Sequence, residues 1–138
     1  GQPRRIGVVF SSNQVPGYHN VVAGLFDSLQ RESPPAEVIG FLGGYEGLIR
    51  GQFVEITKAL VDEYRNLGGQ DMLCEFGDPQ SLHRKEHLEA VIRTVTRKSL
   101  DGLVVVGSLE AQVDSAFIAE ACVAAKLTTR VIGVPLSR

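Results

Sequence analysis

The segment Gly102-Leu103-Val104-Val105-Val106-Gly107, followed by Ser108-Leu109-Glu110, decides the fold of this chain. Its apolar residues stand in an unbroken run, mostly β-branched, with a glycine at each end. A strand with one solvent-exposed face would alternate apolar and polar residues, so an unbroken run is typical of a strand covered on both faces. Such strands belong to parallel sheets with helices above and below. The segment therefore predicts a buried strand of an α/β sheet.

In the rest of the chain, short apolar runs typical of strands alternate with apolar residues at the spacing of a helix. Further strands are predicted from short apolar runs at 6–10, 37–42, 53–56 and 128–134. Helices are predicted from apolar residues at helical spacing around 22–29, 57–64, 88–95 and 113–125. Between them we expect a flexible bend at Gly43, Gly44 and Gly47, and a long loop over 65–80.

This alternation implies a three-layer, Rossmann-like α/β domain with a mostly parallel sheet and helices on both faces. A chain of 138 residues that is 43% hydrophobic can bury one sizeable core, so we expect a single domain over 1–138, as a piece of a longer polypeptide. The net charge of −2 provides no broad basic field, and no apolar run approaches the ~20 residues of a membrane span. We therefore expect neither a nucleic acid nor a membrane as partner.

The two cysteines indicate the redox environment. Cys74 and Cys122 are far apart in the chain, form no C-x-x-C motif and lie in apolar surroundings. This pattern predicts reduced, buried thiols in a cytoplasmic protein. No apolar targeting segment follows Gly1, so we expect no secretory signal in this sequence.

The expected ligand crevice lies at the carboxyl ends of the parallel strands. A loop that joins a strand to a helix binds phosphate when its backbone N–H groups converge and the helix adds its positive end. The loop 11–17, after the first predicted strand, and the loop that begins at Gly107 are the candidates for such a site.

Five segments, in order over nearly the whole chain, resemble the phosphofructokinase family and in particular its pyrophosphate-dependent type. They are Arg5-Ile6-Gly7-Val8-Val9-Phe10 with the loop 14–20, and the segments 40–48, 64–72, 101–107 and 131–135. The resemblance implies the N-terminal α/β domain of a glycolytic 6-phosphofructokinase, which phosphorylates fructose 6-phosphate to fructose 1,6-bisphosphate with Mg²⁺ and ATP or pyrophosphate. It leaves the choice between ATP and pyrophosphate ancestry open. The residues it places near the phosphoryl donor are Ser12, Asn13, Gln14, Gly17, Tyr45, Gly107, Ser108 and Glu110.

The chain departs from the family in its phosphate loop. The family has two adjacent glycines where this chain has Ser12 and Asn13, and a small residue where it has Tyr18. Glycine lets a phosphate approach the backbone without a side chain in the way. This loop therefore predicts either a narrower anion site or a purely structural turn. Tyr45, in the second glycine-rich segment, is equally consistent with a ligand contact and with core packing.

A second departure concerns the metal. After Gly107 the family has an aspartate that helps to hold Mg²⁺, whereas this chain has Leu109 followed by Glu110. Leucine offers no oxygen to a hard cation, so metal-assisted phosphoryl transfer is expected to fail unless Glu110 substitutes for the aspartate. We expect no cofactor for this chain itself.

Two further departures concern the reacting groups. The loop that carries the family's base aspartate resembles the continuation after Pro135, which reads Leu136-Ser137-Arg138 and includes no aspartate. We therefore name no catalytic residue. Gly77 stands where the family has an arginine.

A metal motif unrelated to this family is also present. His83-Arg84-Lys85-Glu86-His87 matches H-x-x-E-H, in which two histidines one helical turn apart share a zinc ion. The same residues open an amphipathic helix, so the alternative is a solvated first turn. We favour that alternative and assign no metal ligand.

Two functions remain open. The first is a non-catalytic phosphofructokinase-like domain, regulatory or structural, that packs against a catalytic phosphofructokinase domain or subunit, senses a phosphorylated small molecule, or forms a homo-oligomer. The second is the donor-binding portion of an active ATP- or pyrophosphate-dependent 6-phosphofructokinase. An unrelated small α/β ligand-binding domain is a third possibility if the ordered segments are coincidence.

Overall fold

The computed structural model describes residues 2–11, 18–66 and 81–135. Its centre is a sheet with the strand order β3-β2-β1-β4-β5. The strands are β1 (Arg5–Phe10), β2 (Glu37–Phe41), β3 (Phe53–Glu55), β4 (Gly102–Gly107) and β5 (Arg130–Pro135). Neighbouring strands are parallel except for the β2–β3 pair, which is antiparallel. The mostly parallel sheet predicted from the sequence is confirmed.

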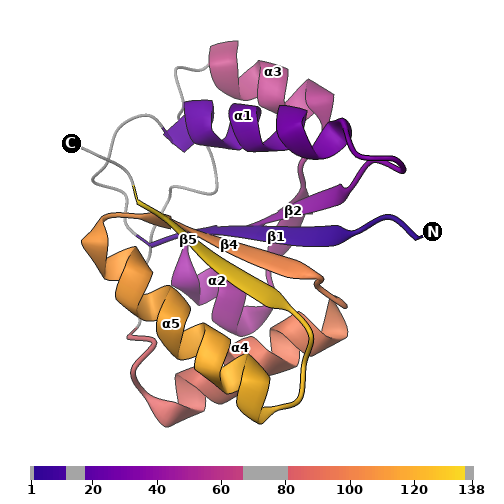
Figure 1. The fold of residues 1–138 in the computed structure, drawn as a ribbon. Coiled ribbons are helices and arrows are strands. Elements are labelled where there is room, and N and C mark those ends of the chain that lie inside the picture. The colour runs from indigo at the N-terminus through magenta and orange to yellow at the C-terminus, as the bar shows by residue number, and fades with distance from the viewer. Residues whose placement is uncertain (1, 12–17, 67–80, 136–138) are drawn as a thin grey trace.

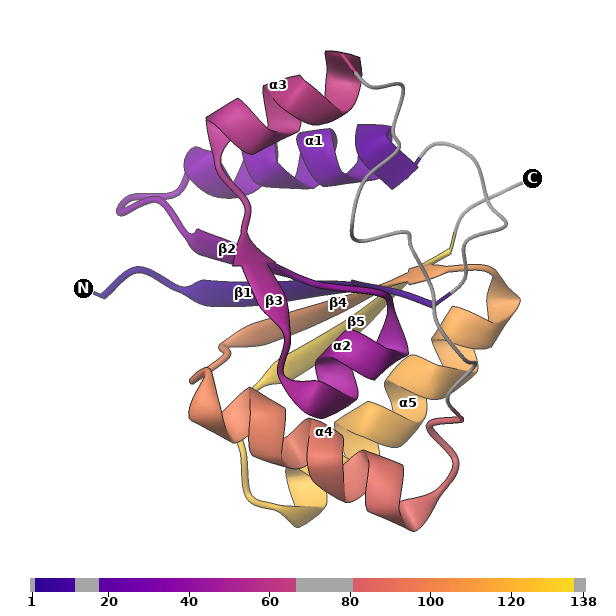
Figure 2. The ribbon, with the colours of Figure 1, turned by 180° about the vertical axis from the view of Figure 1, so that it is seen from behind.

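Helices cover both faces of the sheet (Figure 1). On one face lie α1 (Tyr18–Gln30) and α3 (Lys58–Asn66). On the other lie α2 (Tyr45–Arg50), α4 (Lys85–Arg97) and α5 (Leu109–Ala124). The view from behind shows α2 lying between the sheet and α4 (Figure 2). The three layers expected from the sequence are therefore present.

Each face of the sheet has its own hydrophobic core. Along β4, Val104 and Val106 belong to the core under α1 and α3, whereas Leu103 and Val105 belong to the core under α2, α4 and α5. Successive side chains of a strand point to opposite faces, so the unbroken apolar run supplies both cores at once. Leu103, Val105 and Val106 are fully buried. Burial of each such side chain contributes about 1.5–3 kcal/mol.

Most of the regular elements lie where the apolar patterns placed them. The strands predicted at 6–10, 37–42, 53–56, 103–106 and 128–134 each match an observed strand to within one or two residues. Thr57 caps α3 as predicted, because its Oγ1 accepts a hydrogen bond from the N–H of Leu60 at 3.2 Å. The buried thiol predicted for Cys122 is confirmed, whereas Cys74 lies outside the described residues.

The bend predicted at the glycines after β2 is found at Gly43 and Gly44, which lie in a turn, but was wrong for Gly47, which lies in α2, a helix that the sequence did not predict. Gly43 and Gly44 both have a φ of 71°, and Gly44 is the N-cap of the helix. A Cβ on Gly47 would lie 2.0 Å from the carbonyl oxygen of Leu42, so only glycine fits there. Gly51 ends the helix in the left-handed conformation, with a φ of 75°. Glycines ordinarily weaken a helix, which explains the error.

Two other boundaries differ from the prediction. α5 begins at Leu109 rather than at residue 113, because the chain turns into the helix directly after β4. Arg65 and Asn66, predicted to lie in a long loop, belong to α3, and the rest of that loop lies outside the described residues. Among the helices that the structure describes, none has the length and apolar character needed to cross a bilayer.

Candidate functional site

The ends of β1 and β4 meet at the carboxyl edge of the sheet, where the sequence predicted a crevice. The N–H of Ser11, the residue after β1, donates a hydrogen bond to the carbonyl oxygen of Val106 at 2.9 Å. This bond carries the β1–β4 ladder one step further. It places Ser11 beside the end of β4, as expected for parallel neighbours.

Gly107 is required for this close approach. A Cβ at this position would lie 1.8 Å from the Oγ of Ser11 and 3.5 Å from the Cβ of Ala111. The Ser11 hydroxyl is itself buried, and among the described residues it finds no hydrogen-bond partner of normal geometry. The predicted role of Gly107 as a ligand-binding position stays a prediction, but its structural role is clear.

Tyr45 extends from the start of α2 into the core beneath this edge. Its side chain is buried, and its hydroxyl donates a hydrogen bond of 2.6 Å to Oδ2 of Asp114 on α5. Burial, together with the neighbouring Asp114 carboxylate, raises the pKa of the Tyr45 hydroxyl far above its ordinary value. The hydroxyl therefore stays protonated and joins α2 to α5. A ligand contact of Tyr45 stays a prediction.

Asp114 also contacts a histidine. Its Oδ1 lies 3.2 Å from Nε2 of His83, which precedes α4, and the His83 ring stacks on Phe117 with centroids 4.4 Å apart. Only 13% of the Asp114 side chain is exposed. We call Tyr45, His83, Asp114 and Phe117 the Asp114 cluster. It ties α2, α4 and α5 together directly behind the carboxyl edge.

Sequence reasoning did not single out Asp114. The carboxylate is 69 residues from Tyr45 and 31 residues from His83 in the chain, so no local spacing indicates the cluster. The one available signal was an acidic residue among the apolar residues of α5. Such a residue is equally typical of a solvated helix face.

The two histidines of the H-x-x-E-H motif do not converge. His83 lies before α4 and contacts Asp114, whereas Nδ1 of His87 lies 2.6 Å from the carbonyl oxygen of Ser81. Within residues 2–11, 18–66 and 81–135, no group of three or more His, Cys, Asp or Glu side chains is arranged to hold a metal ion.

The residues at the start of α5 hold the position where the resemblance expects the metal carboxylate. Ser108 is the N-cap of the helix but makes no side-chain capping bond. Leu109 is 79% exposed, and Glu110 is also exposed in the first turn. A carboxylate in a first helical turn is stabilised by the positive end of the helix without any ligand. The side chain directly after Ser108 is thus that of Leu109, which has no oxygen atom to bind a metal ion.

The remaining predicted site residues lie outside the described part of the chain. This holds for Ser12, Asn13, Gln14 and Gly17 of the candidate phosphate loop, and for Gly77 and 136–138. Their predicted donor-binding roles stay predictions. Of the predicted positions, the structure brings Gly107, Ser108 and Glu110 together at the edge and places Tyr45 behind them.

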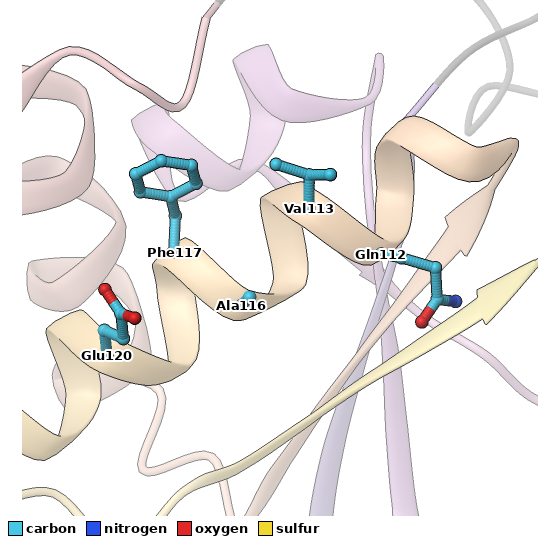
Figure 3. A pocket seen from close by; sticks show the side chains of 5 residues that line it. All are labelled: Gln112, Val113, Ala116, Phe117 and Glu120. Carbon is cyan, nitrogen blue, oxygen red and sulfur yellow. The ribbon is translucent and has the colours of Figure 1, made fainter.

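An apolar groove runs along the outer side of α5, and the sequence did not predict it. It has a volume of about 350 Å³ and is lined by Gln112, Val113, Ala116, Phe117 and Glu120. Figure 3 shows Val113 and Phe117 together on one side of the helix and Gln112 directed towards β5. Leu109, Val113 and Phe117 follow one another at intervals of four residues and are all exposed, so they form a continuous stripe.

The edge of the sheet beside this groove is also apolar. β5 pairs with β4 on one side, and its other side has no neighbouring strand among the described residues. Ile132 on β5 is 55% exposed and, by its register with Val104, faces the side of the sheet covered by α1 and α3. Apolar side chains thus flank the free edge of β5 on both faces.

Comparison with known proteins identifies relatives of the whole described domain. The model of the family "Phosphofructokinase" matches residues 5–137. A pyrophosphate–fructose 6-phosphate 1-phosphotransferase of Treponema pallidum is 43% identical over 136 residues, which are 97% of this chain and 23% of that protein. Subunit alpha 1 of the Arabidopsis thaliana enzyme is 40% identical over 96% of this chain and 21% of the subunit. The chain thus spans less than a quarter of these relatives.

Solved structures share the fold. A phosphofructokinase of Pichia pastoris in the T-state superposes with a TM-score of 0.77 at 17% identity, over 99% of this chain and 16% of that one. A phosphofructokinase of Saccharomyces cerevisiae gives a TM-score of 0.70 at 17% identity, over 97% and 20% of the two chains.

Proposed function

The chain belongs to the phosphofructokinase family, and from this premise we propose that it is a non-catalytic domain of a phosphofructokinase-type protein, with a regulatory or structural role. It works packed against a catalytic phosphofructokinase domain or subunit. The chain corresponds to the N-terminal part of its pyrophosphate-dependent relatives.

The observation that carries this proposal is Leu109. It is the first residue of α5, it directly follows the N-cap after β4, and 79% of its surface is exposed. In the family this position supplies an aspartate to Mg²⁺. An isobutyl group cannot ligate a cation, and phosphoryl transfer depends on a metal ion that neutralises the transferring phosphates. The domain therefore lacks a group that the reaction requires.

The apolar groove on α5 supports the packing role. Leu109 and Val113 on α5 and Ile132 on β5 expose apolar surface beside a strand edge that has no neighbour in the described part of the chain, and such surface is costly to leave in water. The relatives contain more than three quarters of their length outside the matched region. The occupant we propose is a catalytic phosphofructokinase domain or subunit that covers α5 and the β5 edge.

Glu110 is the observation that favours the alternative, the donor-binding portion of an active 6-phosphofructokinase. It is an exposed carboxylate one residue after Leu109, at the edge where Gly107 and Ser108 lie. A shift of the loop by one residue would present its oxygens to a metal. The longer side chain and its place inside the first helical turn make this a poor replacement.

Calorimetric titration of the purified chain distinguishes the two. Pyrophosphate, ATP and fructose 6-phosphate are each added with and without Mg²⁺, to the chain as it is and to the Glu110→Gln variant. We expect no Mg²⁺-dependent binding to the protein, once the heat of Mg²⁺ binding to the phosphate compounds themselves has been subtracted in a titration without protein. Mg²⁺-dependent binding that is lost in Glu110→Gln would overturn the proposal and favour the donor-binding alternative.

A further inference from the structure

A polar cleft, distinct from the apolar groove on α5, lies on the face of the domain formed by α2 and α4. It has a volume of about 90 Å³ and shares no residue with the carboxyl-edge site. The residues that line it come from the end of α2 and the second half of α4, which lie side by side (Figure 2). They are Ile49, Arg50, Gly51, Ala90, Arg93, Thr94, Arg97 and Lys98.

The charge of this cleft is unbalanced. Its lining includes four basic side chains and no acidic one, in a chain whose net charge is −2. Arg50 pairs with Glu46 at 3.4 Å, and the ammonium of Lys98 lies 4.1 Å from the centroid of the Phe53 ring. Arg93 and Arg97 form no ion pair with any described residue. Among the described residues, these two guanidinium groups therefore have no carboxylate partner.

The helix dipole accounts for only part of this cluster. Positive side chains are favourable in the last turn of a helix, which covers Arg50 at the end of α2 and Arg97 and Lys98 at the end of α4. Arg93 lies a full turn further in, where the effect has faded. Arg93 and Arg97 are also spaced four apart, and like charges at this spacing destabilise a helix. Glu89, four residues before Arg93, lies 4.0 Å from Lys85 instead, so neither the helix dipole nor an ion pair among the described residues explains why Arg93 and Arg97 stand together.

The shape of the cleft suits a small ligand. The small residues Gly51, Ala90 and the buried Thr94 line it, together with the exposed Arg93 and Arg97. The Thr94 hydroxyl is already used, since it donates to the carbonyl oxygen of Ala90 at 3.3 Å. The available donors are therefore the guanidinium groups, whose planar forks bind phosphate oxygens in pairs.

We propose that this cleft is a binding site for a small phosphate-bearing anion, held mainly by Arg93 and Arg97 and requiring no metal ion. Arg50 and Lys98 add positive charge at its rim. The site is separate from the carboxyl edge and does not depend on whether the domain is catalytic. A free phosphate and a phosphorylated metabolite share the chemistry it recognises.

An NMR titration with inorganic phosphate, and then pyrophosphate, tests the site directly. We expect saturable shifts of the backbone amides of Gly51, Arg93, Thr94 and Arg97. In the Arg93→Gln/Arg97→Gln variant, binding weakens by at least about tenfold, the effect of losing one charge-assisted hydrogen bond. Arg93→Lys keeps the positive charge but loses the planar guanidinium group. Its affinity for phosphate should therefore lie between those of the parent chain and the double variant.

Lys85→Gln is the matched control, because it removes one positive charge from the same helix at an exposed position outside the cleft. It should leave phosphate binding unchanged. Equal weakening in Lys85→Gln and in Arg93→Gln/Arg97→Gln would mean that the two arginines have no special part in binding and would overturn the site. Phosphate shifts confined to residues near Ser11 and Ser108 would overturn it as well, and would instead locate the anion at the carboxyl edge.

A stability measurement shows whether the variants are folded. Without phosphate, Arg93→Gln/Arg97→Gln should be at least as stable as the parent chain, because a repulsive pair has been removed. Phosphate should raise the Tm of the parent chain and leave that of the variant unchanged, since a ligand stabilises only the state that binds it. A phosphate-dependent rise of equal size in both proteins would contradict the proposal.

Discussion

The hydroxyl of Tyr45 donates a hydrogen bond of 2.6 Å to Oδ2 of Asp114, and this bond joins α2 to α5 behind the carboxyl edge of the sheet. Both partners are largely withdrawn from water, and Asp114 shares its other oxygen with His83. A buried carboxylate that loses a donor keeps the cost of its desolvation. The Asp114 cluster is therefore a stabilising element that depends on both contacts.

Tyr45→Phe should lower the free energy of unfolding by about 1.5–3 kcal/mol, the value of a hydrogen bond to a charged group. Urea denaturation of the two proteins measures the difference. Asp114→Asn and the double variant complete a double-mutant cycle, which isolates the coupling between the two side chains. A coupling energy near zero would show that the bond contributes nothing to stability.

The raised pKa of Tyr45 makes a pH-dependent prediction. Burial, followed by the carboxylate of Asp114, holds this hydroxyl protonated in the folded state, whereas the unfolded chain loses the proton near its ordinary pKa of 10.0. The stabilisation is therefore complete below pH 10 and declines as the pH rises above it, by about 1.4 kcal/mol per pH unit for one group.

Denaturation of the parent chain and of Tyr45→Phe between neutral and alkaline pH measures this contribution. The other ionisable groups titrate in both proteins, so they cancel in the comparison. Above pH 10 the difference in the free energy of unfolding between the two proteins should shrink, because the stability of Tyr45→Phe falls less than that of the parent chain. Parallel curves for the two proteins would show that Tyr45 ionises at an ordinary pH in the fold.

Gly107→Ala should destabilise the domain by about 1–3 kcal/mol, the usual effect of overpacking, because its Cβ would lie 1.8 Å from the Oγ of Ser11. The additional change Ser11→Gly should recover part of this loss. Gly24→Ala is the matched control, since a Cβ there meets nothing within 4 Å and α1 gains about 0.5–1 kcal/mol. Similar effects of the two alanines on thermal unfolding would refute the tight contact.

Val113→Glu should weaken the proposed packing of α5 against a catalytic phosphofructokinase domain, because it places a charge in the middle of the exposed stripe. Val123→Glu is the control on the same helix, since Val123 is 75% exposed and does not line the groove. Co-purification with the remainder of the Treponema pallidum enzyme measures the association. Equal retention of both variants would argue against α5 as the contact surface.

The order of the elements was predictable because strands and helices each have their own apolar period. The run 103–106 predicted β4 correctly, and Thr57 predicted the start of α3. α2 was not predictable in this way, because its glycines are selected by a close approach to Leu42 and by positive φ angles, which only the folded backbone reveals.

The candidate site was predictable only where it follows directly from the strand ends. Gly107, Ser108 and Glu110 lie together at the carboxyl edge because they continue β4 into α5. The Asp114 cluster and the cleft with Arg93 and Arg97 arise from contacts between helices that are distant in the chain. No local pattern encodes such contacts.

The most direct test of the non-catalytic role is a chimera in which this chain replaces the matching 23% of the Treponema pallidum pyrophosphate–fructose 6-phosphate 1-phosphotransferase. The measurement is formation of fructose 1,6-bisphosphate from fructose 6-phosphate, pyrophosphate and Mg²⁺. We expect a folded chimera without activity, and recovery of activity when Leu109→Asp is combined with Ser12→Gly and Asn13→Gly. A chimera that is as active as the parent enzyme without these changes would contradict the account.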